Sequence, residues 1–204
     1  MRKPGTEACW RMPSEREAPA SKRLFIALPL DEPTRGTIAA VAERLRAAGL
    51  RGRFVHPENY HVTLAFLGNV RLDALEGVRE AIDRAAHASA ALELRLERIG
   101  AFPSERHARV VWLGPLATPA GFAQLHGALL ANLARNGFTL DSKPQPHVTL
   151  CRCDGAPLPP VSLPETLALK ADALALYSSL TLAGGPHYAL EHRTALARVC
   201  EAKE

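Results

Sequence analysis

The 204-residue sequence lacks the features that mark several large classes of protein. It contains no apolar run near the roughly 18 residues that a membrane-spanning helix needs. Its basic N-terminus is not followed by the apolar stretch of a secretory signal. Aromatic residues are also scarce, at 5% of the chain. We therefore expect a soluble, cytoplasmic protein that does not act at a membrane.

Cysteine is rare as well, and the spacing of Cys9, Cys151, Cys153 and Cys200 matches no zinc finger or zinc ribbon. Cys151 and Cys153 would share one face of a strand, but a metal site would need further ligands converging there. We predict free thiols, no bound metal and no other cofactor.

The charge balance favours an anionic partner. The chain has 25 basic and 21 acidic residues, a net charge of +4, and 20 of the basic residues are arginine. The planar guanidinium offers a fork of donors that suits phosphate. A compositional bias of the genome would give the same arginine excess, so the composition alone does not identify the partner.

The apolar pattern predicts a chain of alternating strands and helices. Residues 1–22 show no periodicity and are expected to form a disordered extension before a single domain over 23–204. The predicted helices span 31–48, 73–88 and 119–136. We expect strands at 23–28, at 60–67 ending at Gly68-Asn69, at 92–99, at 109–113, at 147–152, at 167–182 with a bend or bulge, and at 188–196. The strands at 92–99 and 109–113 are expected to form an antiparallel pair.

One tetrapeptide, His-Val-Thr-Leu, occurs at 61–64 and again at 147–150. The order of predicted elements before each copy is similar, which indicates an approximate internal duplication with an offset of 86 residues (147 minus 61). This order favours an α+β fold with two small antiparallel sheets facing a shared cleft, and not a doubly wound parallel sheet.

The alternation of a strand places His61 and Thr63 on one face, and His147 and Thr149 on the corresponding face of the second copy. Hydrolysis of a phosphodiester needs a base for the water, an acid for the leaving oxygen and donors for the phosphoryl oxygens. Two histidines can be the base and the acid because imidazole titrates near neutral pH, and threonine hydroxyls can be the donors. The repeat therefore predicts a metal-independent site.

The sequence resembles the two-histidine (2H) phosphoesterases, and among them the bacterial and archaeal RNA 2′,3′-cyclic phosphodiesterases, also called 2′-5′ RNA ligases. The segments that carry the resemblance are Arg-Leu-Phe-Ile-Ala (23–27), Glu-Asn-Tyr-His-Val-Thr-Leu-Ala-Phe-Leu-Gly (58–68), Arg-Val-Val-Trp-Leu-Gly (109–114), Pro-His-Val-Thr-Leu-Cys-Arg (146–152) and Leu-Tyr-Ser-Ser (176–179). The resemblance implies a bilobal fold with pseudo-twofold symmetry. It also implies that His147 accepts the proton of water, that His61 protonates the leaving oxygen, and that the product is a 2′-phosphate.

The resemblance also assigns Arg152 to the phosphate and makes Phe66 a candidate for stacking on a base. Strict alternation, however, places Arg152 on the face opposite His147. A role for Arg152 therefore requires a bulge, a strand end or a long side chain that curls round. Phe66 meets the same difficulty, and core packing is its favoured role.

Two other functions stay open. The cleft could bind or ligate RNA ends, including tRNA halves, without hydrolysis as its main role, or it could act on another small cyclic phosphate such as ADP-ribose 1″,2″-cyclic phosphate. We expect a monomer whose partners are RNA ends or small cyclic nucleotides. Tyr177 fits either the cleft or the core, Trp112 fits the core, and structural or surface roles are favoured for five other histidines, at 56, 87, 107, 126 and 187.

Overall fold

The computed structural model describes residues 20–197 except 142, 164 and 183–184. The helices are α1 (Glu32–Ala47), α2 (Leu75–His87) and α3 (Ala120–Arg135), with short 3₁₀ helices η1 (Pro57–Asn59) and η2 (Leu72–Ala74). The strands are β1 (Ser21–Pro29), β2 (Arg53–Phe54), β3 (His61–Arg71), β4 (Leu92–Leu96), β5 (Arg98–Ser104), β6 (His107–Gly114), β7 (Val148–Arg152), β8 (Leu167–Ala171), β9 (Ala173–Leu182) and β10 (Gly185–Ala195). The α+β class expected from the sequence is confirmed.

The three predicted helices are present within one or two residues of their expected ends. In α1 the Asp31 side chain accepts a hydrogen bond from the Thr34 amide at 2.8 Å, which satisfies one of the free amides of the first turn. Ile38, Val41 and Leu45 form its buried stripe at helical spacing. Local capping and periodicity therefore account for this helix.

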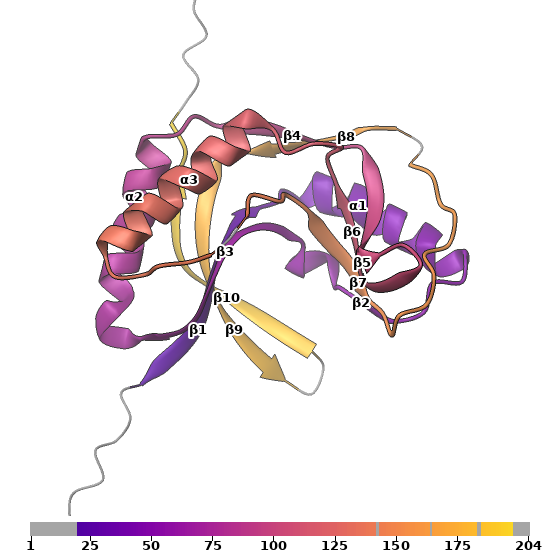
Figure 1. The fold of residues 1–204 in the computed structure, drawn as a ribbon, viewed down its shortest axis with the longest axis horizontal. Helices are drawn as coiled ribbons and strands as arrows, with labels where there is room; N and C mark the ends of the chain where they lie inside the picture. The colour runs from indigo at the N-terminus through magenta and orange to yellow at the C-terminus, as the bar shows by residue number, and fades with distance from the viewer. Residues whose placement is uncertain (1–19, 142, 164, 183–184, 198–204) are drawn as a thin grey trace, which may run out of the picture.

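Eight strands form one antiparallel sheet, in the order β10-β9-β1-β3-β7-β6-β5 with β2 added beside β7. At its centre β3 and β7 are paired only at Val62 and Val148. The sheet divides at this junction into two lobes, which Figure 1 shows on either side of β3 and β7. The two sheets expected to flank a cleft are therefore joined at one point.

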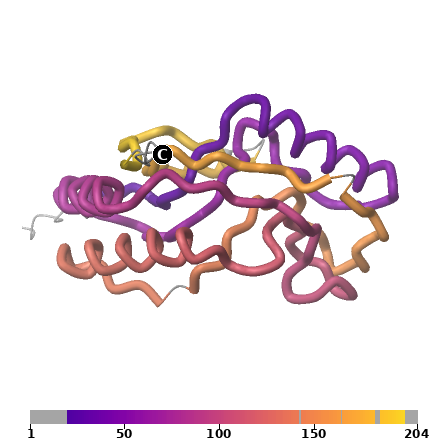
Figure 2. The backbone as a smooth tube through the Cα atoms, turned by 90° about the horizontal axis from the view of Figure 1, so that it is seen from above, coloured from indigo at the N-terminus to yellow at the C-terminus, as the bar shows by residue number. Residues whose placement is uncertain are grey.

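The topology repeats about the β3–β7 junction. The run β1-α1-β3 has its counterpart in β6-α3-β7, and β4 and β8, which precede β5 and β9, pair with each other as a separate sheet. Each half of the chain also contributes to the other lobe, because β5 pairs with β6, and β9 pairs with β1. Helix α1 lies on the lobe of β2 and β7, whereas α3 packs with α2 on the lobe of β1 and β9 (Figures 1 and 2).

Three strand predictions differ from the structure. The segment 92–99 is split, so that β4 pairs with β8 and only β5 pairs with β6. The segment 167–182 is split at Asp172, because β8 and β9 belong to different sheets. Strand β3 does not end at Gly68 but continues to Arg71, because Gly68 adopts a φ of 69° and the pairing with β1 resumes beyond it.

Strand β1 begins at Ser21, two residues before the expected start of the domain at Arg23. Lys22 pairs with Val70 across the sheet and its ammonium lies 2.8 Å from Glu191 of β10. Residues 1–19 of the predicted disordered extension lie outside the described residues. Within residues 20–197, as described, no helix is long and apolar enough to span a membrane.

The Trp112 ring lies across the backbone of Gly100, and a Cβ atom at Gly100 would come within 2.4 Å of it. We expect Gly100→Ala to lower the free energy of unfolding by about 1–3 kcal/mol, the usual effect of overpacking a core. The matched control is Gly36→Ala in α1, where a Cβ atom meets nothing within 4 Å. That change should raise stability by about 0.5–1 kcal/mol. Urea unfolding followed by circular dichroism measures the change in unfolding free energy in both variants. Equal changes would contradict the close contact between Gly100 and the Trp112 ring.

Candidate active site

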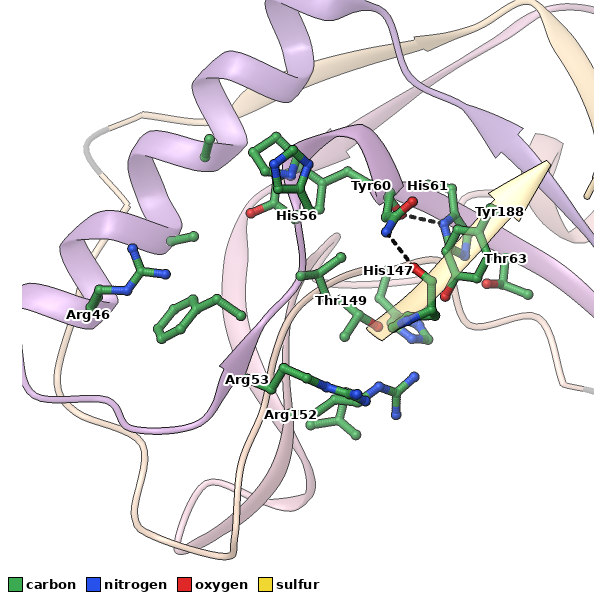
Figure 3. Close-up of a pocket in the computed structure, with 18 of the residues that line it drawn as sticks. Arg46, Arg53, His56, Tyr60, His61, Thr63, His147, Thr149, Arg152 and Tyr188 are labelled. Atoms are coloured by element: carbon green, nitrogen blue, oxygen red, sulfur yellow. Dashed lines mark hydrogen bonds between the residues drawn. The ribbon is translucent and has the colours of Figure 1, made fainter. Parts of the chain in front are cut away.

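A cavity of about 670 Å³ lies between the lobes at the β3–β7 junction. Its walls include both histidines and both threonines of the repeated motif (Figure 3). Arg152 and Phe66 also line it. The structure therefore brings all six predicted site residues to one cavity.

The two motif histidines are held in the same way. The Nδ1–H of His61 donates to the backbone carbonyl of Asn59 at 2.7 Å, and that of His147 donates to the carbonyl of Gln145 at 2.9 Å. A carbonyl can only accept, so Nδ1 of each ring carries the proton. In the neutral state this leaves Nε2 of each imidazole as a free proton acceptor.

Asn59 has a second role. Its side-chain amide donates to the carbonyl of Pro186 at the start of β10, at 3.1 Å (Figure 3). The carbonyl that orients His61 is thereby tied to another element of the same lobe. The sequence places Asn59 two residues before the first motif histidine. Its contact with Pro186 of β10 depends on the fold and could not be predicted from the sequence.

Burial in the cleft lowers the pKa of both histidines. The pKa of His61 falls from 6.5 to about 4, mainly through desolvation, and the nearby His147 and Arg152 lower it further. Desolvation also lowers the pKa of His147, and Arg152 adds to this, while the Gln145 carbonyl opposes it. The larger shift belongs to His61. Both imidazoles are therefore neutral near pH 7 in the free protein.

Each histidine rests against aromatic rings from the two neighbouring strands. The ring of His61 lies 4.8 Å from Phe25 of β1, which stacks on Tyr177 of β9 at 5.3 Å. The ring of His147 lies 6.1 Å from Trp112 of β6, which lies 5.3 Å from Phe102 of β5. The strands correspond under the pseudo-twofold relation. These rings fix the imidazoles by packing and exclude water from one side of each.

Trp112 is buried, as predicted, and Tyr177 lies behind Phe25 and does not line the cavity. Tyr188 of β10 does line the cavity, with its ring 5.5 Å from His61. Phe25, Phe102 and Tyr188 were not predicted as site residues, because only the strand order brings them to the histidines.

Strand β7 contains a bulge at Leu150, the last residue of the second motif. Across from β6, Thr149 pairs with Trp112 and Cys151 pairs with Val111, which leaves Leu150 as an extra residue. A bulge of this kind shifts the alternation by one, so both Leu150 and Cys151 are buried and Arg152 returns to the side of Thr149. This is the bulge that a role for Arg152 requires.

Strand β3 contains the equivalent bulge. Thr63 pairs with Ala27 and Ala65 with Ile26, so Leu64 is the extra residue. Phe66 is thereby turned into the cavity and is 68% exposed. The favoured core role of Phe66 is therefore wrong. Its counterpart in the second lobe is Arg152, and the two equivalent positions present an aromatic ring and a guanidinium to the same cleft.

The remaining candidates lie elsewhere or at the rim. His56 lines the cavity in the connector before η1 and is exposed, whereas His126 is buried in α3. The Sγ atoms of Cys151 and Cys153 lie 3.5 Å apart as buried free thiols, as predicted, while Cys9 and Cys200 lie outside the described residues. Among the described residues, no three His, Cys, Asp or Glu side chains form a group that could hold a metal.

Known proteins show the same combination of sequence and fold. Residues 28–112 match the family model described as LigT like Phosphoesterase. The chain is 32% identical over 133 residues to an RNA 2′,3′-cyclic phosphodiesterase of Methanothermobacter thermautotrophicus, covering 65% of this chain and 72% of that protein. The Escherichia coli K12 protein of the same name is 31% identical over 150 residues, covering 72% and 81%. The crystal structure of E. coli LigT complexed with 3′-AMP matches with a TM-score of 0.69 and 29% identity, over 86% of this chain and 98% of that chain.

The lowered pKa of His61 predicts a dependence of stability on pH. In the folded state its pKa is about 4, and in the unfolded state it is near 6.5, so the unfolded chain binds the proton more readily. The contribution of His61 to stability is complete above pH 6.5 and is lost as the pH falls toward 4. We expect His61→Asn to reduce the loss of unfolding free energy between these pH values, measured by urea unfolding. The matched control is His107→Asn, at an exposed position, which should lose as much unfolding free energy between these pH values as the native protein does. An equally large loss in His61→Asn would contradict the lowered pKa of His61.

Proposed function

The chain belongs to the LigT-like phosphoesterase family, and on this basis we propose that it opens 2′,3′-cyclic phosphate ends of RNA to 2′-phosphomonoesters without a metal ion. The observation that carries the proposal is the pair of equivalently held imidazoles, each with Nε2 free toward one cavity. Relatives named RNA 2′,3′-cyclic phosphodiesterase and a LigT structure with 3′-AMP support the substrate class.

The phosphate is held by groups that surround the two histidines. The hydroxyls of Thr63 and Thr149 donate to its non-bridging oxygens, and Arg152 neutralises its charge. The cyclic phosphodiester carries one negative charge, and more charge develops on its oxygens as water attacks. Donors that are already in place stabilise this charge without reorganisation.

The reaction needs one proton acceptor and one proton donor. Nε2 of His147 accepts a proton from water as the water oxygen bonds to phosphorus, and Nε2–H of His61 protonates O3′ as the P–O3′ bond breaks. The product is a 2′-phosphate with a free 3′-hydroxyl. Each turnover leaves His147 protonated and His61 neutral, so both must exchange protons with solvent before the next.

The pKa shifts are consistent with these roles. His61 has the lower pKa and is the stronger acid once it is protonated, whereas His147, with the smaller shift, is the stronger base. An anionic phosphate between the rings favours the protonated form of the donor. The active form of the histidine pair therefore carries one proton, because repulsion between two protonated imidazoles disfavours a second.

Phe66 provides the part of the site that contacts no phosphate. It is exposed in the cavity on the His61 lobe, opposite the guanidinium of the His147 lobe. We assign it to stacking on the base of the terminal nucleotide, a contact that is tolerant of sequence because every base has a π-face. This arrangement would orient the substrate in an otherwise nearly symmetrical cleft.

We expect the reaction to take place in a cytoplasmic monomer. One chain supplies both histidines, both threonines and Arg152 to the same cavity, so a second subunit is not needed to complete the site.

Replacing either histidine should abolish the reaction. We expect His61→Ala and His147→Ala each to lower kcat by at least about 10²-fold, the usual contribution of one acid or base. Product analysis by phosphorus NMR should show a 2′-phosphate with the native protein, in the presence of EDTA as well as without it. A 3′-phosphate product, a loss of activity with EDTA, or full activity in either variant would contradict the mechanism.

The dependence of kcat/KM on pH should be bell-shaped. The free protein must hold one proton on the histidine pair, so kcat/KM should fall as the pH drops toward 4 and also as the pH rises past the pKa of His147, which desolvation lowers from its ordinary value. The maximum is therefore expected in mildly acidic solution. Initial rates with a 2′,3′-cyclic nucleotide in buffers of constant ionic strength test this, and a rate that increases steadily to pH 8 would exclude the two-imidazole mechanism.

A further inference from the structure

A second arginine lies directly beside Arg152. Arg53 of β2 is its partner in the antiparallel pairing with β7, and both side chains are exposed and line the cavity. Figure 3 shows the two guanidinium groups close together on one side of the motif residues. Directly opposed residues of an antiparallel pair have Cβ atoms about 5 Å apart, and like charges at such positions destabilise the sheet.

Neither of these two charges is neutralised by a residue that the structure describes. In the part of the chain that the structure describes, no carboxylate lies within 4.0 Å of Arg53 or Arg152. The third arginine of the cavity is different, because Arg46 is paired with Glu43 and stacks 4.3 Å above the ring of Phe54. Two neighbouring guanidinium groups without a counter-ion are the electrostatic pattern of a site for anionic groups.

The reacting phosphate accounts for only one of these arginines. A cyclic phosphodiester carries a single negative charge, which Arg152 and the two motif threonines can bind. Arg53 comes from a different strand, and the same cavity is also lined by Phe54 and by the small side chains Ala39 and Ala42 of α1. There is thus both a free charge and space beyond the site of the reaction.

We propose that Arg53 forms a second-phosphate subsite, which binds the phosphate on the 5′ side of the terminal nucleotide. In an RNA this phosphate is the diester that links the terminal nucleotide to the rest of the chain. Arg53 would then be a specificity residue that makes a polynucleotide end, or a 5′-phosphorylated nucleotide, a better substrate than a cyclic nucleoside monophosphate. The inference rests on the proposed function, since it locates a second group relative to the cyclic phosphate.

Three substrates that share one reacting group test the proposal. They are adenosine 2′,3′-cyclic phosphate, its 5′-phosphorylated form, and the dinucleotide ApA with a 2′,3′-cyclic end. We expect the native protein to show a lower KM for the last two. Arg53→Gln should raise the KM for these by about tenfold or more, with a much smaller change for the first substrate. It should also reduce the slope of log KM against log salt by about 0.7, the value for one lost contact with a single strand.

The control is Arg51→Gln, which removes the same charge two residues away at an exposed position outside the cavity. It should leave all three KM values close to those of the native protein. Arg53→Lys keeps the charge and should recover part of the preference. A lower KM of the native protein for both substrates with two phosphates than for adenosine 2′,3′-cyclic phosphate supports the subsite. A lower KM for the dinucleotide alone supports it as well. An equal effect of Arg53→Gln on all three substrates, or no effect, overturns it.

Failure of the proposed function would be seen separately. If the native protein hydrolyses none of the substrates, the function is wrong, and the subsite is tested by calorimetry with adenosine 3′,5′-bisphosphate and adenosine 3′-phosphate. Tighter binding of the bisphosphate that is lost in Arg53→Gln supports the second-phosphate subsite. Equal affinity of the native protein for the two nucleotides overturns it.

Discussion

A regular β-strand presents only every second side chain to a cleft, and this limit governs the whole site. His61 and Thr63 use the two positions that alternation allows, and the same is true in the second motif. The extra residue at Leu64 and at Leu150 shifts the alternation, so that the third side chain turned to the cavity is Phe66 or Arg152 and not Ala65 or Cys151. Without the bulges the cleft would lack both its phosphate-binding guanidinium and its exposed aromatic ring.

The junction of β3 and β7 provides the second condition. Because the strands are paired only at Val62 and Val148, the lobes diverge and leave a cavity where the motif side chains project. The backbone carbonyls that orient the imidazoles belong to the segments entering each strand, so the orientation follows from the chain path. The same geometry that brings the histidines together also removes water from them, and their lowered pKa values follow from this.

Much of this arrangement follows from the sequence, and the limits of the prediction are physical. Alternation and repetition identify the histidine and threonine pairs, and periodicity identifies the three helices. A bulge is different, because Leu64 and Leu150 look like ordinary apolar strand residues until their partners are known. The exposure of Phe66 and the pairing of Arg53 with Arg152 likewise depend on register between distant segments. The division of 92–99 between two sheets has the same cause.

The exchange of elements between the two lobes has a consequence for the integrity of each half of the chain. Cut between β5 and β6, the chain would give one fragment with α1, β2 and β5 but without β6 and β7, and another with α3 and β9 but without α2 and β1. Each fragment would expose a sheet edge and an apolar face that only the complementary fragment covers. The two halves of the chain therefore exchange elements as the subunits of an intertwined dimer do. The connection between β5 and β6 keeps them together, whereas two separate repeats would have to associate from solution.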